Sequence, residues 1–208
     1  SNTTHKIVPM LLSPLEAENY HDQIYDMKSF ITAFKDAGFK TFFFSNQGRN
    51  GAVIDGFSRE ADSVLFLRDT NPNALDGDLL PLLKQAIADN TPKKLIVMHT
   101  YGSHYSYFDR YPNWCHTFGV NSPSQLMLMN QDDLIDNYDN SVRYTSYIID
   151  QAIKEVAQDS ISAAVFFAGD HGEDLFDDER CRSLHASPSP TFWQLHVPML
   201  IWFSPQYE

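Results

Sequence analysis

An aspartate and a histidine stand side by side at the point where an apolar segment of the chain ends. Asp170 and His171 follow Gly169, and the segment 161–167 before them is apolar and partly β-branched, which is typical of a buried strand. A carboxylate and an imidazole are both good ligands for a borderline cation such as zinc. The pair therefore predicts a metal site at a strand end. A plain turn is the alternative, because Gly-Asp and His-Gly are also common loop dipeptides.

Several other polar side chains follow apolar segments in the same way. They are His99, Ser103 and His104 after the segment 94–98, Asn46 and Gln47 after the segment 39–45, and His185 in the loop that follows Asp170. If these segments are parallel strands, their carboxyl ends meet at one edge of a sheet, where ligands bind in open α/β folds. A single histidine is more often a structural polar residue than a ligand, so the prediction of one shared site depends on the joint placement.

The elements that would position these residues alternate along the chain. Apolar residues at helical spacing predict helices, and short apolar runs between turn residues predict strands. The predicted strands cover 39–45, 63–67, 94–98, 161–168 and 197–203, and the predicted helices cover 23–37, 79–87 and 132–158. Strands that alternate with helices indicate an α/β fold with a mostly parallel sheet flanked by helices on both faces.

Two segments do not fit this simple pattern. Thr3 or Thr4 could cap a helix over the apolar run 7–12, but Pro9 within that run argues against a simple helix. The stretch 105–130 is irregular, and it is long for a loop in a compact domain.

Composition limits the classes of function. The 208 residues suit one α/β domain, and the formal net charge is −12 with a pI near 4.9. No basic cluster would neutralise phosphates, so no nucleic-acid partner is expected, and an anionic substrate would need a local cation such as a metal. No apolar run approaches the ~20 residues of a membrane span, and no secretory leader is expected. Cys115 and Cys181 could pair or remain thiols, and the acidic stretch 174–180 is expected to be a solvated loop.

The order of the motifs resembles that of one family. The string HTYGSH at 99–104, followed by YFDRYP at 107–112, resembles the H-T-x-G-S-H…Y-x-x-R-Y-P signature of bacterial phosphoethanolamine transferases. These are membrane-anchored enzymes of the sulfatase/alkaline-phosphatase superfamily. Further segments that resemble motifs of the family are 44–47 (FSNQ), 136–145 (DNYDNSVRYT), 170–173 (DHGE, with Gly169 in place of the usual Ser) and 184–188 (LHASP).

The resemblance implies roles for individual residues. Thr4 begins the segment 4–9 (THKIVP), which falls on the family's nucleophile motif T-x-x-x-V-P, so Thr4 would be the nucleophile. Asp170 and His171 would bind Zn²⁺. His104 and His185 would bind the phosphoryl oxygens, bind a second ion or transfer a proton. The residues that would contact the substrate are Asn46, Gln47, His99 and Ser103.

The resemblance also implies partners and a location. The family's zinc site is completed by a glutamate at the end of a strand before the nucleophile, and these 208 residues begin just before Thr4. We therefore expect a single, partial sulfatase-like catalytic domain over 1–208 that binds zinc weakly or not at all. The parent enzyme would take a head group from a phospholipid donor and pass it to a glycolipid acceptor. It would act at the periplasmic face of the inner membrane as a monomer anchored by a segment outside these residues.

Three other functions stay open. A sulfatase-type hydrolase would use water as the acceptor, but Thr4 does not lie in the C/S-x-P-x-R context in which sulfatases form formylglycine. A phosphoglycerol transferase that builds teichoic-acid-like polymers is a closer alternative within the same superfamily. The third alternative is a binding domain without catalytic activity, which the missing strand favours for this fragment.

Overall fold

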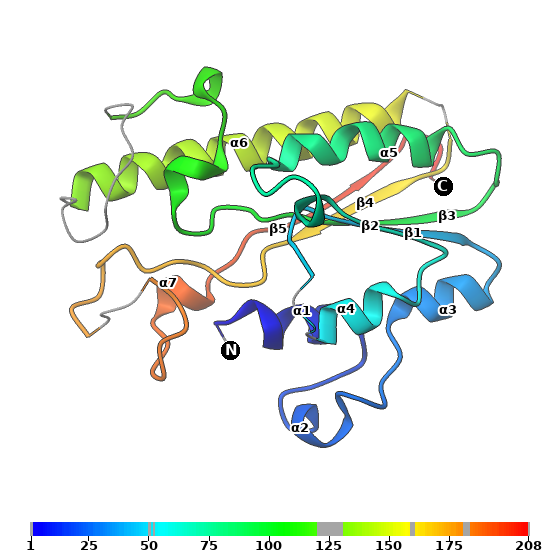
Figure 1. Cartoon of the computed structure of the whole chain (residues 1–208), viewed down its shortest axis with the longest axis horizontal. Helices are drawn as coiled ribbons and strands as arrows, with labels where there is room; N and C mark the ends of the chain where they lie inside the picture. Colours follow the sequence, from blue (N-terminus) through cyan, green and yellow to red (C-terminus); the bar gives the residue numbers. More distant parts are fainter. Residues whose placement is uncertain are drawn as a thin grey trace.

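The chain forms a sheet with helices on both faces (Figure 1). The computed structural model describes residues 2–49, 51, 53–119, 131–158, 161–180 and 184–207, so Cys181 and the second half of the stretch 105–130 lie outside the described residues. The elements in chain order are α1 (Thr4–Leu12), α2 (Tyr20–Gln23), α3 (Phe30–Asp36), β1 (Lys40–Ser45), α4 (Val53–Ser58), β2 (Ser63–Phe66), η1 (Leu67–Asp69), η2 (Asp76–Leu79), α5 (Leu80–Ile87), β3 (Lys94–His99), η3 (Tyr107–Arg110), η4 (Asn113–Cys115), α6 (Gln131–Ala157), β4 (Ala164–Ala168), α7 (Phe192–Leu195) and β5 (Met199–Phe203).

Strand β1 lies in the middle of a three-stranded parallel sheet, between β2 and β3. Ser45 at the end of β1 pairs with Phe66 of β2 and with His99 of β3, so the three strands end at the same edge. The predicted α/β fold with a parallel sheet and flanking helices is confirmed. The last strand differs, because β5 pairs antiparallel with β4 in a separate ladder. Among the described residues between β4 and β5, the short helix α7 is the only helix, whereas a parallel return would need a full crossover connection.

The three consecutive phenylalanines of β1 explain why helices cover both faces of the sheet. Side chains alternate along a strand, so neighbouring residues point to opposite faces. Phe42 and Phe44 pack with Leu79 and Ala86, on the face covered by α5. Phe43 packs with apolar residues of α1, α3 and α4 on the other face. Figure 1 shows α5 and α6 on one side of the sheet and α1, α3 and α4 on the opposite side.

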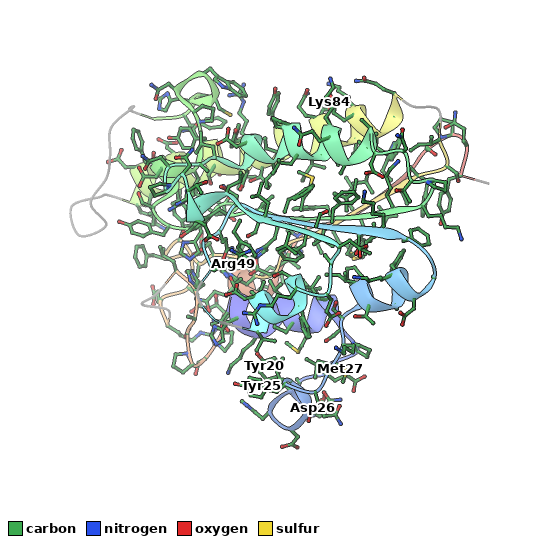
Figure 2. The ribbon with its side chains drawn as sticks, turned by 45° about the vertical axis from the view of Figure 1, so that its right-hand side comes forward. Tyr20, Tyr25, Asp26, Met27, Arg49 and Lys84 are labelled. Atoms are coloured by element: carbon green, nitrogen blue, oxygen red, sulfur yellow. The ribbon has the colours of Figure 1, made fainter. Side chains whose placement is uncertain are left out.

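The predicted helix over 23–37 is correct only from Phe30 onward. The segment before it forms the short helix α2 and a turn around Tyr25, which projects beyond the helix layer and is exposed (Figure 2). Ser29 caps α3 with its side chain. The carboxylate of Glu60 accepts hydrogen bonds from the Ser29 backbone N at 3.0 Å and from Ser29 Oγ at 2.6 Å. A contact distant in sequence thus fixes the start of α3, which a local pattern does not encode.

Pro9 lies inside helix α1, contrary to the expectation that it would prevent a simple helix there. Proline has no N–H, so the carbonyl of His5 one turn earlier loses its usual helical donor. The hydroxyl of Tyr20 replaces that donor, at 2.8 Å from the His5 carbonyl oxygen. Ser13 Oγ in turn donates to the Pro9 carbonyl oxygen at 2.7 Å at the end of the helix. Side-chain hydroxyls thereby satisfy backbone groups that would otherwise oppose the helix.

Large apolar side chains are exposed on the β4–β5 ladder. Phe166, Met199 and Ile201 are 61%, 69% and 53% exposed, respectively. Contiguous apolar surface of this kind is uncommon on soluble monomers. Within the described ranges, no helix combines the length and the apolar character needed to cross a bilayer.

Candidate active site

Thr4 is the first residue of helix α1, and its hydroxyl faces the strand end that follows β4. Thr3 is the N-cap, with an extended backbone that turns the chain into the helix. Thr4 Oγ1 lies 3.2 Å from His171 Nε2, although the two residues are 167 positions apart in the sequence. The unpaired N–H groups and the dipole at a helix start favour negative charge, so a phosphate next to Thr4 would be stabilised.

His171 is held in one orientation by its own backbone neighbourhood. Its side chain is 6% exposed, and its Nδ1 lies 3.0 Å from the carbonyl oxygen of Gly172. A carbonyl oxygen only accepts, so Nδ1 carries the proton in the neutral ring and Nε2 keeps its lone pair. That lone pair points toward Thr4 Oγ1, and a carboxylate oxygen of Asp170 lies 3.7 Å from the same nitrogen. An unprotonated Nε2 at this position can accept a proton or bind a metal.

His185 and His104 extend the cluster away from Thr4. The ring centroids of His171 and His185 are 4.6 Å apart, and those of His185 and His104 are 5.0 Å apart. His185 Nδ1 lies 2.9 Å from Glu173 Oε1, and this hydrogen bond raises the pKa of His185. Burial lowers the pKa of His104, whose Nδ1 lies 2.6 Å from the Tyr105 carbonyl oxygen. The lowered pKa keeps His104 neutral near pH 7, with a free lone pair on Nε2.

Three of these side chains have the chemistry of a zinc site. His171, Glu173 and His185 each offer one ligand atom, and these atoms lie within 4.8 Å of one another. Glu173 Oε2 is buried and makes no hydrogen bond of ordinary geometry among the described residues, although the buried Tyr107 hydroxyl lies near the same carboxylate, so this oxygen has a lone pair to offer a cation. Two imidazoles and a carboxylate form a common donor set for catalytic zinc. The set fits the metal, and it shares His171 with the predicted pair of Asp170 and His171.

Glu173 had no role in the sequence-based prediction, although it stands two residues from His171 in the same motif. The loop that carries His185 depends on further residues that no local pattern marked. Asn2 Nδ2 donates to the Ser187 carbonyl oxygen at 3.2 Å and to Gln194 Oε1 at 2.8 Å. Gln194 Nε2 donates to the Leu184 carbonyl oxygen at 3.1 Å. These bonds tie the residues around His185 to the start of the chain, next to Thr4.

The expectation that the acidic stretch 174–180 is a solvated loop is correct for Asp177 and Glu179, which are exposed, but not for Asp174. Asp174 is fully buried and accepts a hydrogen bond from Thr191 Oγ1 at 2.6 Å. Its backbone N donates to the Leu184 carbonyl oxygen at 2.7 Å. A buried carboxylate must find donors, and besides Thr191 they are the backbone N–H groups of Asp177 and Asp178 in its own loop, at 3.0 and 3.4 Å.

The predicted substrate residues at the ends of β1 and β3 make hydrogen bonds with neighbouring side chains and backbone in the described part of the chain rather than with the histidine cluster. His99 Nδ1 lies 3.0 Å from Ser45 Oγ, and burial lowers the pKa of His99 in spite of nearby carboxylates. Asn46 donates to Asp76, and Gln47 Nε2 lies 3.4 Å from the Thr100 carbonyl oxygen. Ser103 precedes His104 in the loop after β3. These contacts connect strand ends to one another, and direct contact of these residues with substrate stays a prediction.

Gly172 allows the chain after His171 to lie directly against α7. Its backbone N donates to the Gln194 carbonyl oxygen at 3.0 Å, and a Cβ on Gly172 would overlap the carbonyl oxygen of Trp193. We expect Gly172→Ala to destabilise the protein by roughly 1–3 kcal/mol, because backbone must move to admit the methyl group. Urea unfolding measures the loss. The matched control is Gly56→Ala in α4, where a Cβ meets nothing within 4 Å. Equal stability of both variants would contradict the prediction.

A parallel sheet covered by helices, with a helix-start threonine opposite histidines at the sheet edge, defines the class. It is an α/β domain whose fold resembles that of a protein in the alkaline phosphatase superfamily from Vibrio parahaemolyticus, which matches 85% of this chain and 41% of its own with a TM-score of 0.51 and 18% identity. The chain belongs to the Sulfatase family, whose model matches residues 1–208.

Curated relatives confirm the resemblance to phosphoethanolamine transferases. Phosphoethanolamine transferase EptC of Escherichia coli (strain K12) is 27% identical over 201 residues, which cover 92% of this chain and 35% of that protein. The protein YhbX of the same strain is 32% identical over 194 residues, which cover 91% of this chain and 32% of that protein. The chain therefore spans about a third of the length of these relatives.

A solved structure agrees with the sequence relatives. The C-terminal periplasmic domain of EptC from Escherichia coli, in complex with Zn, superposes with a TM-score of 0.86 and 25% identity. The match covers 99% of this chain and 60% of that domain. The chain is thus homologous to phosphoethanolamine transferases and shares the fold of their periplasmic domains.

Proposed function

We propose that this chain is the catalytic part of a zinc-dependent phosphoethanolamine transferase. The enzyme would move the head group of a phospholipid to a glycolipid of the cell envelope, at the periplasmic face of the inner membrane, as an anchored monomer. The observation that carries the proposal is the 3.2 Å approach of Thr4 Oγ1 to His171 Nε2, with His185 and His104 next in line. The named relatives support the choice of phosphoethanolamine as the transferred group.

In the first half of the reaction, the Thr4 oxygen attacks the phosphorus of the donor phospholipid. A bond forms between Thr4 Oγ1 and phosphorus, the bond from phosphorus to the glycerol oxygen breaks, and diacylglycerol leaves. The start of α1 faces the phosphoryl oxygens and stabilises their charge. His104, which its lowered pKa keeps neutral near pH 7, takes up the proton that the Thr4 hydroxyl loses and passes it to the leaving glycerol oxygen.

In the second half, a hydroxyl of the glycolipid attacks the phosphorus of phosphoethanolamine-Thr4. Neutral His104 accepts the hydroxyl proton and passes it to Thr4 Oγ1 as the bond between that oxygen and phosphorus breaks. His171, Glu173 and His185 would hold zinc, with Asp170 as a neighbouring carboxylate. Zinc bound there supplies Lewis acidity, which lowers the pKa of a hydroxyl and draws in phosphoryl oxygens.

Parallel assays of the whole protein test the proposal against its rivals. The substrates are phosphatidylethanolamine with a glycolipid acceptor, phosphatidylglycerol with the same acceptor, and p-nitrophenyl sulfate. We expect transfer from phosphatidylethanolamine to exceed the other two rates. Preference for phosphatidylglycerol would instead identify a phosphoglycerol transferase, and fast release of sulfate would identify a sulfatase. If zinc binds tightly but no substrate reacts, the chain is a binding domain.

A further inference from the structure

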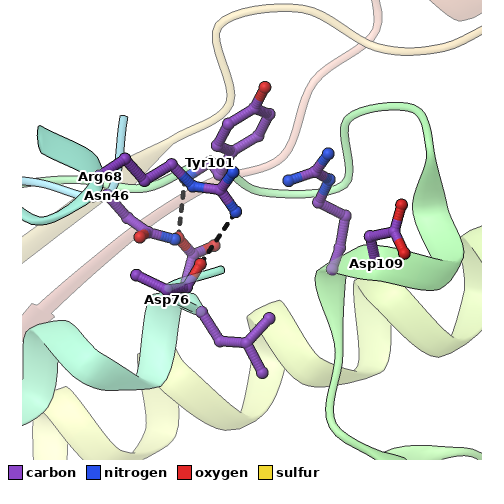
Figure 3. Close-up of a pocket in the computed structure, with 8 residues that line it drawn as sticks. Asn46, Arg68, Asp76, Tyr101 and Asp109 are labelled. Atoms are coloured by element: carbon purple, nitrogen blue, oxygen red, sulfur yellow. Dashed lines mark hydrogen bonds between the residues drawn. The ribbon is translucent and has the colours of Figure 1, made fainter. Parts of the chain in front are cut away.

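Asp76 is a buried carboxylate that the proposed reaction does not use. It begins η2 and is 3% exposed. Its Oδ1 accepts hydrogen bonds from Asn46 Nδ2 and from the Tyr101 backbone N, each at 2.8 Å, and its Oδ2 accepts from the Gly102 backbone N at 2.9 Å. Figure 3 shows the side chains of Asn46 and Asp76 facing each other below the ring of Tyr101. The carboxylate thus connects the end of β1 to the loop that follows β3.

Two arginines hold the same loop. The guanidinium carbon of Arg110 lies 3.9 Å from the centroid of the Tyr101 ring, and that of Arg68 lies 4.5 Å from it. Both distances are within the range of a cation–π interaction. Arg110 Nε also donates to the His104 carbonyl oxygen at 3.0 Å. Asp76 therefore fixes the beginning of the loop at residues 101 and 102, and Arg110 fixes its end at His104.

The space among these side chains is not a binding pocket. It is lined by Asn46, Arg68, Asp76, Tyr101 and Arg110, and essentially no volume within it is open to a water-sized molecule. A ligand would need to displace the carboxylate or one of the guanidinium groups. The charged groups of Asp76, Arg68 and Arg110 therefore interact with other parts of the protein rather than with a ligand. Any influence of Asp76 on the active site would act through the loop that follows β3.

We propose that Asp76 is a positioning residue that keeps His104 beside His185. A carboxylate that accepts backbone N–H groups forms charge-assisted hydrogen bonds, which are stronger than neutral ones. Those bonds hold Gly102 at a φ of +65°, a left-handed conformation that glycine adopts more readily than other residues. Without them the loop gains freedom, and His104 leaves its place 5.0 Å from the His185 ring. The catalytic consequence rests on the proposed function, whereas the position of His104 does not.

Asp76→Asn keeps the size of the side chain and removes its charge and one acceptor. The matched control is Asp78→Asn, on the same short helix, whose exposed carboxylate accepts from the Leu75 backbone N at 3.0 Å. Three quantities are measured: amide exchange at Tyr101 and Gly102, the nuclear Overhauser effect between the His104 and His185 rings, and kcat with KM for head-group transfer by the whole protein. Arg110→Lys serves as a second variant should Asp76→Asn fail to fold.

In Asp76→Asn we expect exchange at Tyr101 and Gly102 to accelerate at least about tenfold while the rest of the sheet stays protected. The ring-to-ring signal should disappear, and kcat should fall by roughly 10–100-fold with KM within about twofold, because a displaced proton donor affects the chemical step. Asp78→Asn should match the wild type in all three. An unchanged ring-to-ring signal, or exchange that accelerates over the whole sheet, would overturn the proposal. If the wild type transfers no head group, the proposed function fails while the two spectroscopic measurements still decide the role of Asp76.

Discussion

Thr4→Ala should abolish transfer, with a loss in kcat of at least about 10⁴-fold, because removal of a nucleophile leaves only binding and charge stabilisation. The expected cause is loss of the covalent intermediate on the hydroxyl that lies 3.2 Å from His171 Nε2. Intact-mass measurement after mixing with phosphatidylethanolamine should show an adduct on the wild-type protein and none on the variant. Because Thr3 rather than Thr4 is the N-cap of α1, the unfolding midpoint should change little.

Thr4→Ser is the matched control, since it keeps a hydroxyl at the same helix position. It should retain measurable transfer and form the adduct. An adduct on Thr4→Ala would place the nucleophile elsewhere in the chain. Loss of activity in Thr4→Ser with a normal adduct would instead indicate that the methyl group of threonine is needed for the second half of the reaction.

His171→Ala should weaken zinc binding by at least about 100-fold, because loss of groups that only support a ligand already costs 10–100-fold. His171 is the expected ligand because its unprotonated Nε2 faces Thr4 and Asp170, while its ring lies 4.6 Å from that of His185. Competition with a zinc-sensitive dye measures the affinity. His21→Ala, which removes an exposed imidazole, should bind zinc as the wild type does.

Two further variants decide which carboxylate completes the zinc site. Glu173→Gln should weaken binding as strongly as His171→Ala if zinc lies among His171, Glu173 and His185. Asp170→Asn should have the larger effect if zinc lies between Asp170 and His171 on the side of Thr4. If none of these variants changed the affinity for zinc, the metal would not bind at this cluster.

The fold was largely predictable because its signals are local. The apolar runs that became β1, β3 and β4 end in polar residues, and α6 spans Gln131–Ala157 where a helix over 132–158 was expected. Five predicted site residues also lie in one contiguous group: Thr4, His104, Asp170, His171 and His185. The rule that parallel strands end at one edge of a sheet predicted this grouping, although β4, which precedes Asp170 and His171, pairs with β5 in a separate antiparallel ladder.

What could not be predicted depends on contacts between distant segments. The helix inside 23–37 starts late because Glu60 holds Ser29, and α1 tolerates Pro9 because a hydroxyl of Tyr20 reaches its backbone. Asn46 donates to Asp76, a contact that no local pattern indicated, while its contact with substrate stays a prediction. A sequence shows that a polar residue follows a strand, but it does not show which neighbour will satisfy that residue's hydrogen bonds.

The exposed β4–β5 ladder is expected to affect how these 208 residues behave in concentrated solution. Phe166, Met199 and Ile201 present an exposed apolar surface through which molecules would associate. Exposed apolar strands of this kind are starting points for aggregation. The net charge of −12 opposes this by mutual repulsion of the molecules. That repulsion reaches only ~10 Å at 0.1 M salt, so purification buffers of high ionic strength should promote precipitation before they affect folding.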